Sequence, residues 1–311
     1  MKSSRFMRVI LLATLLIVAL AGCGGDDSGN EDTGSSQSSQ GFLNLSITDA
    51  PIDEVDSVIV QFTGVEIQPE TGDRLEFEFE EPRQIDLLDL QSGVSDFLLA
   101  QKPLPAGRYS WIRLKVETGP GSLDSYVKLA DDSIYPLVIP SGNQSGLKLN
   151  RGFIVPAGAT ASFTIDFDLR KSVHKPSPES SDEYRLRPTL RLVDNVEAGS
   201  IAGTVDPDLI SHAEGSVCAV YLFEGRDAVP ADININGSET GPLTTASIKL
   251  DPLSGEYTFR AAFLNAGDYT LAFTCQAGDD DPETDDHIIF GETANVAVLA
   301  GAETICDFLL P

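Results

Sequence analysis

Short segments in which apolar and polar residues alternate constrain the fold of this chain more than any other feature. Alternation with a period of two is typical of strands with one buried face, and the Gly, Pro, Asp and Asn residues between the segments favour turns. Helical periodicity is confined to Leu87–Ala100, where Gly93 limits a helix to a turn or two. The sequence therefore predicts an all-β fold. The alternating segments are Phe42–Ser46, Val58–Phe62, Leu75–Phe79, Tyr109–Val116, Ala161–Leu169, Ser200–Val205, Val217–Phe223, Glu256–Phe263, Tyr269–Cys275, Ala294–Leu299 and Thr304–Leu310.

A weak internal repeat divides these segments into two sets. Leu104-Pro-Ala-Gly-Arg-Tyr109 leads into a strand, as does Leu264-Asn-Ala-Gly-Asp-Tyr269. A second pair of Ala-Gly turns follows in the same order, ending at Gly158 and at Gly301, each before an Asp-Phe pair. Glycine can adopt the positive φ of a tight turn, and the aromatic residue packs the start of the next strand. We predict two tandem β-sandwich domains of related topology, over residues 41–197 and 198–311.

The N-terminus carries the pattern of an export signal. Three basic residues precede an apolar run, Val9–Ala21, that is shorter than the roughly 20 residues needed to span a bilayer. We predict a signal peptide over residues 1–22. The following residues, 23–40, contain neither hydrophobic side chains after Cys23 nor Lys or Arg, which predicts a disordered tether.

The end of the apolar run, Leu20-Ala-Gly-Cys23, resembles a bacterial lipobox. The resemblance implies a lipoprotein in which the Cys23 thiol takes up diacylglycerol, so that several acyl chains, palmitate among them, hold the protein stably on a membrane. Gly24 stands where Asp is the usual inner-membrane retention signal, which implies an outer-membrane lipoprotein, facing the periplasm or the surface. The alternative is an ordinary secretory signal followed by a chance cysteine.

The net charge of the chain limits the classes of partner that it can bind. The chain has 21 Lys+Arg against 48 Asp+Glu, a net charge of -27. Such a chain repels phosphate backbones and anionic headgroups, so we expect no nucleic-acid partner and a membrane contact only through the lipid anchor. A glycan or protein partner remains open.

Several motifs resemble known families. Thr48–Asp53, Val58–Ile67, Leu104–Tyr109 and Asp166-Phe167 resemble the bacterial lipoprotein domain catalogued as domain of unknown function 4382, over roughly residues 41–196. Gly199–Val205 and the second Ala-Gly-x-Tyr turn resemble a carboxypeptidase-regulatory or transthyretin-like sandwich, also called carbohydrate-binding-like. Neither resemblance implies catalytic residues.

Catalytic motifs are missing from the sequence. The three histidines stand alone, and no HExxH, GxSxG, CxxC or P-loop pattern occurs. We therefore expect that the protein is not an enzyme and binds no cofactor. We expect it to be a non-catalytic, membrane-anchored binding or structural module. The alternatives are a glycan- or matrix-binding adhesin and a carboxylate-based hydrolase, which the single Trp and 7 Tyr disfavour.

The cysteines predict one disulfide. Export places Cys218, Cys275 and Cys306 in an oxidising compartment. Cys218 opens a strand and Cys275 closes one, as in an antiparallel neighbouring pair. We predict the pair Cys218–Cys275, with Cys275–Cys306 as the alternative.

Two acidic groups are candidates for a cation site. Asp279–Asp286 holds six acids between two strands, and oxygen-rich loops of this kind suit Ca²⁺. The candidate ligands are Asp279, Asp281, Glu283 and Asp285; the alternative is a solvated loop. The second group, Asp49, Asp53, Glu54 and Asp56, favours turn chemistry around Pro51.

The densest basic segment is Tyr184–Leu192, whose alternation places Arg185, Arg187 and Arg191 on one face with Thr189. We expect these arginines to pair across strands with Glu76, Glu78 and Glu80, which alternate in the same way. The alternative is a site for an anion or a polysaccharide carboxylate.

Overall fold

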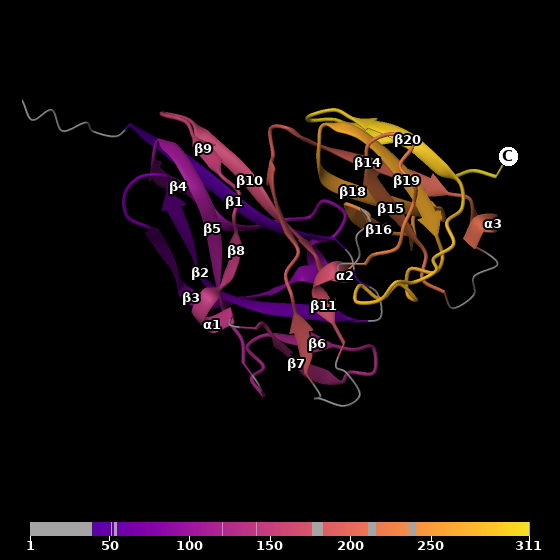
Figure 1. The fold of residues 1–311 in the computed structure, drawn as a ribbon, viewed down its shortest axis with the longest axis horizontal. Helices are drawn as coiled ribbons and strands as arrows, with labels where there is room; N and C mark the ends of the chain where they lie inside the picture. The colour runs from indigo at the N-terminus through magenta and orange to yellow at the C-terminus, as the bar shows by residue number, and fades with distance from the viewer. Residues whose placement is uncertain are drawn as a thin grey trace, which may run out of the picture. The chain divides into compact units, whose positions relative to one another are not determined.

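The computed structural model describes residues 39–50, 52, 55–119, 121–140, 142–175, 183–210, 216–234, 236 and 241–310. All of them belong to one compact unit. The prediction of an all-β fold is confirmed, because strands form four sheets and each described helix is a single short turn (Figure 1).

Two sheets, which together we call the first lobe, contain the strands up to Asp194. One has the order β13-β10-β1-β4; the other runs β11-β12-β7-β6-β2-β5-β8, with β3 on β2 and β9 on β5. The lobe also has three single turns of helix: η1 (Leu87–Leu90), α1 (Gly142–Ser145) and α2 (Leu169–Ser172). The strands are β1 (Gln40–Ala50), β2 (Ser57–Pro69), β3 (Leu75–Asp86), β4 (Asp96–Pro105), β5 (Gly107–Glu117), β6 (Tyr126–Lys128), β7 (Ile134–Val138), β8 (Leu147–Leu149), β9 (Phe153–Val155), β10 (Thr160–Asp168), β11 (Val173–His174), β12 (Tyr184–Leu186) and β13 (Leu190–Asp194).

The apolar residues of the alternating segments form the core of the first lobe. Leu43, Leu45 and Ile47 of β1 are fully buried, and so are Val60 and Phe62 of β2 in the other sheet. Burying side chains of this size removes about 1.5–3 kcal/mol of unfavourable hydration each. This one core joins the inner faces of both sheets, as in a β-sandwich.

Two further sheets, which we call the second lobe, contain residues 198–310. Their orders are β17-β18-β14-β21 and β16-β15-β19-β20. They enclose a separate core around Val220, Leu222, Leu264 and Leu271. The elements are β14 (Ala198–Val205), α3 (Pro207–Ile210), β15 (Ala219–Glu224), β16 (Thr244–Ser247), β17 (Lys249–Leu250), β18 (Tyr257–Asn265), β19 (Gly267–Thr274), β20 (Thr293–Val298) and β21 (Glu303–Ile305).

The repeated Ala-Gly-x-Tyr turns have the same geometry in both lobes. The Tyr109 hydroxyl donates to the Pro105 carbonyl at 2.6 Å, and the Tyr269 hydroxyl donates to the Asn265 carbonyl at 2.8 Å. Both rings are buried, so each bond fixes a tyrosine at the corner between two strands.

Strand pairing around these turns is also repeated. β1 pairs with β10 in parallel and with β4 antiparallel, just as β14 pairs with β21 in parallel and with β18 antiparallel. Gly158 and Gly301 share a φ of +69° in the turns before β10 and β21. The sequence repeat therefore reflects a repeated strand arrangement.

The basic segment Tyr184–Leu192 does not form one strand, so the predicted stripe is wrong. Arg185 lies in β12 and Arg191 in β13, which belong to different sheets. Pro188 lies between them and has no N–H for a ladder. The chain here crosses between the sheets, held by hydrogen bonds from the Arg187 amide to the Ser172 carbonyl and from the Thr189 amide to the Ser172 hydroxyl.

The expected partners of these arginines are wrong as well. Glu78 pairs with Lys115, and Glu76 with Arg74 at 2.5 Å. Arg187 pairs with Glu283 instead, and Arg191 with Asp166.

None of the described helices is long and apolar enough to cross a membrane.

Candidate functional site

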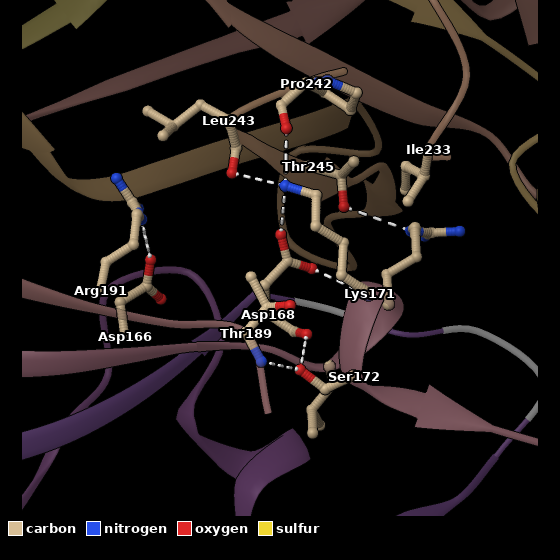
Figure 2. Close-up of polar contacts among 12 residues, drawn as sticks. Asp166, Asp168, Lys171, Ser172, Thr189, Arg191, Ile233, Pro242, Leu243 and Thr245 are labelled. Atoms are coloured by element: carbon tan, nitrogen blue, oxygen red, sulfur yellow. Dashed lines mark hydrogen bonds and ion pairs between the residues drawn. The ribbon is translucent and has the colours of Figure 1, made fainter. Parts of the chain in front are cut away.

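The most concentrated polar chemistry lies where α2 of the first lobe meets the second lobe (Figure 2). Asp168 caps this turn by accepting a hydrogen bond from the Lys171 amide at 3.2 Å. The side chains of Arg170 and Lys171 then project toward β16 and its neighbours in the second lobe. Both residues come from a sequence that resembles an ordinary charged turn, yet Arg170 is only 4% exposed.

Lys171 connects three groups. Its Nζ lies 2.6 Å from the Pro242 carbonyl oxygen and 2.8 Å from the Leu243 carbonyl oxygen. The same nitrogen is 2.8 Å from Asp168 Oδ2, an ion pair whose angle is not that of a hydrogen bond. The ammonium therefore neutralises a carboxylate of one lobe while it donates to the backbone of the other.

Arg170 makes a second connection beside the first. Its Nε donates to the Thr245 hydroxyl at 3.2 Å, and its Nη1 donates to the Ala277 carbonyl at 2.7 Å. A buried guanidinium needs such acceptors because desolvation of a charge is costly.

Three buried carboxylates lie next to these cations. Arg191 holds Asp166 through its Nε at 3.0 Å and through Nη2, while Asp168 is held by Lys171. Burial raises the pKa of Asp166, and Arg191 opposes that rise. Burial, and then the charges of Asp166 and Asp168, raise the pKa of Asp49 well above its ordinary value. Asp49 accepts one hydrogen bond, from the Leu169 amide at 3.3 Å, and its Oδ2 has no partner.

The space beside these carboxylates is small. Asp49 and Asp166 line a cavity of about 20 Å³ together with Thr244, Thr245 and Arg260 of the second lobe. Such a volume holds about one water molecule.

A second contact joins the lobes through the acidic loop. Arg187 donates to Glu283 at 2.6 Å, and His174 Nδ1 lies 3.6 Å from the same carboxylate oxygen. His174 is buried, neither ring nitrogen has a hydrogen bond, and burial lowers its pKa. The neutral ring is therefore the favoured form at neutral pH.

The acidic loop gathers carboxylates, but not the four proposed for calcium. Among the residues that the structure describes, only Asp232, Asp280 and Asp286 bring three ligand oxygens within 4.8 Å of one another. Asp279, Asp281, Glu283 and Asp285 form no such group, and calcium binding stays a prediction.

Asp280 is the buried member of that group. It accepts hydrogen bonds from the Tyr221 hydroxyl at 2.7 Å and from the Ile233 amide at 3.1 Å, and burial raises its pKa to about 6. The sequence pointed to the loop but not to Asp280, because its acids look alike. Asp232 is also far away along the chain.

The predicted disulfide is confirmed. Cys218 and Cys275 are bonded across the neighbouring strands β15 and β19, as expected for an antiparallel pair. Cys306 is a free, half-buried thiol, which excludes the alternative pair Cys275–Cys306, and burial raises its pKa.

Other predicted positions lie outside the described residues. They include Cys23, the signal peptide and nearly all of the tether, together with Asp53 and Glu54 of the second acidic group. Lipidation at Cys23 stays a prediction. Asp49 is buried against the start of α2, away from the turn chemistry expected for it.

Comparison with known proteins finds a family match over part of the chain. Residues 40–188 match the family model described as Domain of unknown function (DUF4382). The resemblance of the first half to this family is thereby confirmed, and that of the second half to transthyretin-like sandwiches stays a prediction. No curated protein matches the sequence.

Several solved structures are similar to this chain at low identity. The Bacillus anthracis TIE protein is 14% identical, with a TM-score of 0.18, and the match covers 86% of this chain and 34% of that one. This chain therefore spans about a third of the TIE protein. GBS52, the minor pilin of Streptococcus agalactiae, is 11% identical over 86% of this chain and 94% of its own, with a TM-score of 0.20. BcpA, the major pilin subunit of Bacillus cereus, is 10% identical over 86% and 99%, with a TM-score of 0.19. Likeness at this level carries no argument about function.

Proposed function

We propose that the protein is a non-catalytic binding or structural module of the bacterial cell envelope, in which two β-sandwich lobes act as one rigid body. The observation that carries this proposal is the use of the buried charges at α2. Lys171 and Arg170 of the first lobe donate hydrogen bonds to backbone carbonyls and a hydroxyl of the second lobe.

The same observation argues against catalysis at this site. A general acid or base must reach a substrate, and a pair of catalytic carboxylates needs a cleft between them. Asp49, Asp166 and Asp168 are instead buried, and the space beside the first two has room for about one water. The raised pKa values of Asp49 and Asp166 follow from structural burial, which also perturbs pKa values outside active sites.

The anchor belongs to the same proposal. Lipidation of Cys23 would hold the module at the outer membrane, and the residues before Gln40 would separate it from the bilayer. An anchored spacer or binding module needs a rigid body, since a flexible joint between the lobes would leave its binding surface without a fixed position.

Labelling with radioactive palmitate in the native host tests the anchor. We expect label in the wild-type protein, and none in Cys23→Ser, which should leave the membrane fraction. Cys306→Ser is the matched control, because it removes a free thiol elsewhere and should keep the label. Incorporation into Cys23→Ser would contradict the proposed anchoring.

A further inference from the structure

Three exposed arginines of the first lobe, Arg108, Arg151 and Arg185, have no acidic partner although the chain is rich in acids. Seven described arginines, Arg74, Arg83, Arg113, Arg187, Arg191, Arg226 and Arg260, each contact a carboxylate. The exposed side chains of Arg108 and Arg151 make neither an ion pair nor a hydrogen bond with any described residue. With 48 acids against 21 bases, acids to pair with are plentiful.

Arg151 lies between two adjoining cavities. The smaller has a volume of about 270 Å³ and lies where the edge strand β8 faces the edge strand β13. Its charged lining consists of Lys148, Arg151 and Arg191, and no carboxylate lines it. Arg191 is already bound to Asp166, so Lys148 and Arg151 carry the free positive charge.

Apolar side chains form only part of this lining, where Leu149, Leu190 and Leu192 lie beside the polar groups. The Lys148 ammonium lies 4.5 Å from the centre of the Trp111 ring, a cation–π contact with a residue that lines neither cavity.

The larger cavity, of about 460 Å³, continues from the first and shares Arg151 and Leu192 with it. Its charged lining consists of Arg108, Arg151 and three carboxylates, Glu70, Asp194 and Glu197. Asp194 accepts a hydrogen bond from the Val196 amide, whereas the exposed side chains of Glu70 and Glu197 have no partner among the described residues. The combined groove therefore offers cations along one part and free hydrogen-bond acceptors along the other.

We propose that this groove binds a polysaccharide that contains uronic acids. Sugar carboxylates would pair with Arg151, Lys148 and Arg108, because a guanidinium matches a carboxylate in two parallel hydrogen bonds. Sugar hydroxyls would donate to Glu70 and Glu197. The inference deepens the proposed binding role and rests on it.

The groove discriminates against other ligands. An acidic peptide would meet Glu70 and Glu197 with like charge, and it has few hydroxyls to offer them. A neutral glycan would leave the cations of the smaller cavity without partners. A uronic-acid polymer satisfies both parts of the groove.

Titration calorimetry of the full chain with polygalacturonate tests the inference. At about 0.15 M salt the screening length is about 8 Å, so repulsion from the distant acidic surface is largely removed. We expect polygalacturonate to bind, and neutral dextran and polyglutamate to bind at least about tenfold more weakly. Comparable binding of either control polymer would overturn the inference.

Variants locate the site. Arg151→Glu should weaken polygalacturonate binding by about tenfold or more. Arg185→Glu is the matched control, because Arg185 is also exposed and unpaired but lies in β12, outside the groove; its affinity should equal that of the wild type. Equal affinity in wild type and Arg151→Glu would overturn the inference. The thermal midpoint of each variant confirms that it is folded.

The acceptor end has its own test. Glu70→Gln with Glu197→Gln should weaken polygalacturonate binding if these carboxylates accept sugar hydroxyls. Stronger binding of polyglutamate by this double variant than of polygalacturonate would identify an acidic peptide as the ligand and overturn the inference. If polygalacturonate fails to bind at all while Cys23 is labelled and the lobes unfold together, the groove inference fails and the envelope module stands.

Discussion

The two lobes repeat one strand arrangement but stabilise it in different ways. Beyond the repeated arrangement, the first lobe has long strands such as β2 and β3, and it buries a single extended core between its sheets. No cysteine occurs among its described residues. The second lobe has shorter sheets and a smaller core, and a disulfide joins β15 to β19 at one end. Because smaller domains bury a smaller fraction of their surface, a cross-link matters more there.

Removing the disulfide should therefore have the largest effect of the changes considered for the lobes. Cys218 and Cys275 are 57 residues apart, and opening a loop of this length costs about 4 kcal/mol in the chain-entropy model. We expect Cys218→Ser with Cys275→Ser to lower the free energy of unfolding by about that amount, as measured with urea. Cys306→Ser is the control and should change it little. A double variant as stable as the wild type would show that the smaller core suffices alone.

Asp280 should make the stability of the second lobe depend on pH. Its pKa in the folded protein is about 6, above the ordinary value of 3.8, so folding favours the protonated form. Stability from this group is present below pH about 4 and is lost as the pH rises toward 6. Asp280→Asn should remove this part of the pH dependence, about 2 kcal/mol between those limits. Urea unfolding from pH 4 to 7 measures it, with Asp281→Asn as the exposed control. An unchanged profile in Asp280→Asn would contradict the assignment.

The tyrosine corners should show the smallest effect, and an equal one. Tyr109→Phe and Tyr269→Phe each remove one buried hydrogen bond to a carbonyl, which costs about 1 kcal/mol. Parallel urea titrations of the two variants test whether the repeated turns contribute alike. Tyr126→Phe is a suitable control, since its hydroxyl makes no hydrogen bond with any described residue. If only one variant lost stability, the two turns would share a geometry but not a contribution to the free energy of unfolding.

Local patterns explain what the sequence predicted well. Alternation fixes which face of β1 or β2 is buried, and the Ala-Gly-x-Tyr turn depends on a glycine and an aromatic residue two positions apart. The pairing of Cys218 with Cys275 followed from their places at the ends of strands. Each of these inferences uses residues within one strand or turn, or at its ends.

The predictions that failed needed tertiary information. Arg185 and Arg191 alternate as if in one strand, but Pro188 lies where the chain passes from one sheet to another. Asp280 meets Asp232 only because the folded loop returns to that segment. Lys171 and Arg170 look like surface charges until the second lobe covers them. No periodicity in the sequence marks a charge that will be buried by another lobe.

The central claim is that the buried charges of α2, Lys171 first among them, hold the two lobes together as one body, and differential scanning calorimetry of the full chain tests it most directly. For the wild type we predict a single transition whose calorimetric and van't Hoff enthalpies agree. Lys171→Met leaves Asp168 without its counter-charge and two carbonyls without their donor, so its lobes should unfold in two separate transitions. Lys128→Met, which removes a lysine paired only within the first lobe, should keep the single transition. Two transitions in the wild type, or an unchanged single transition in Lys171→Met, would contradict the account.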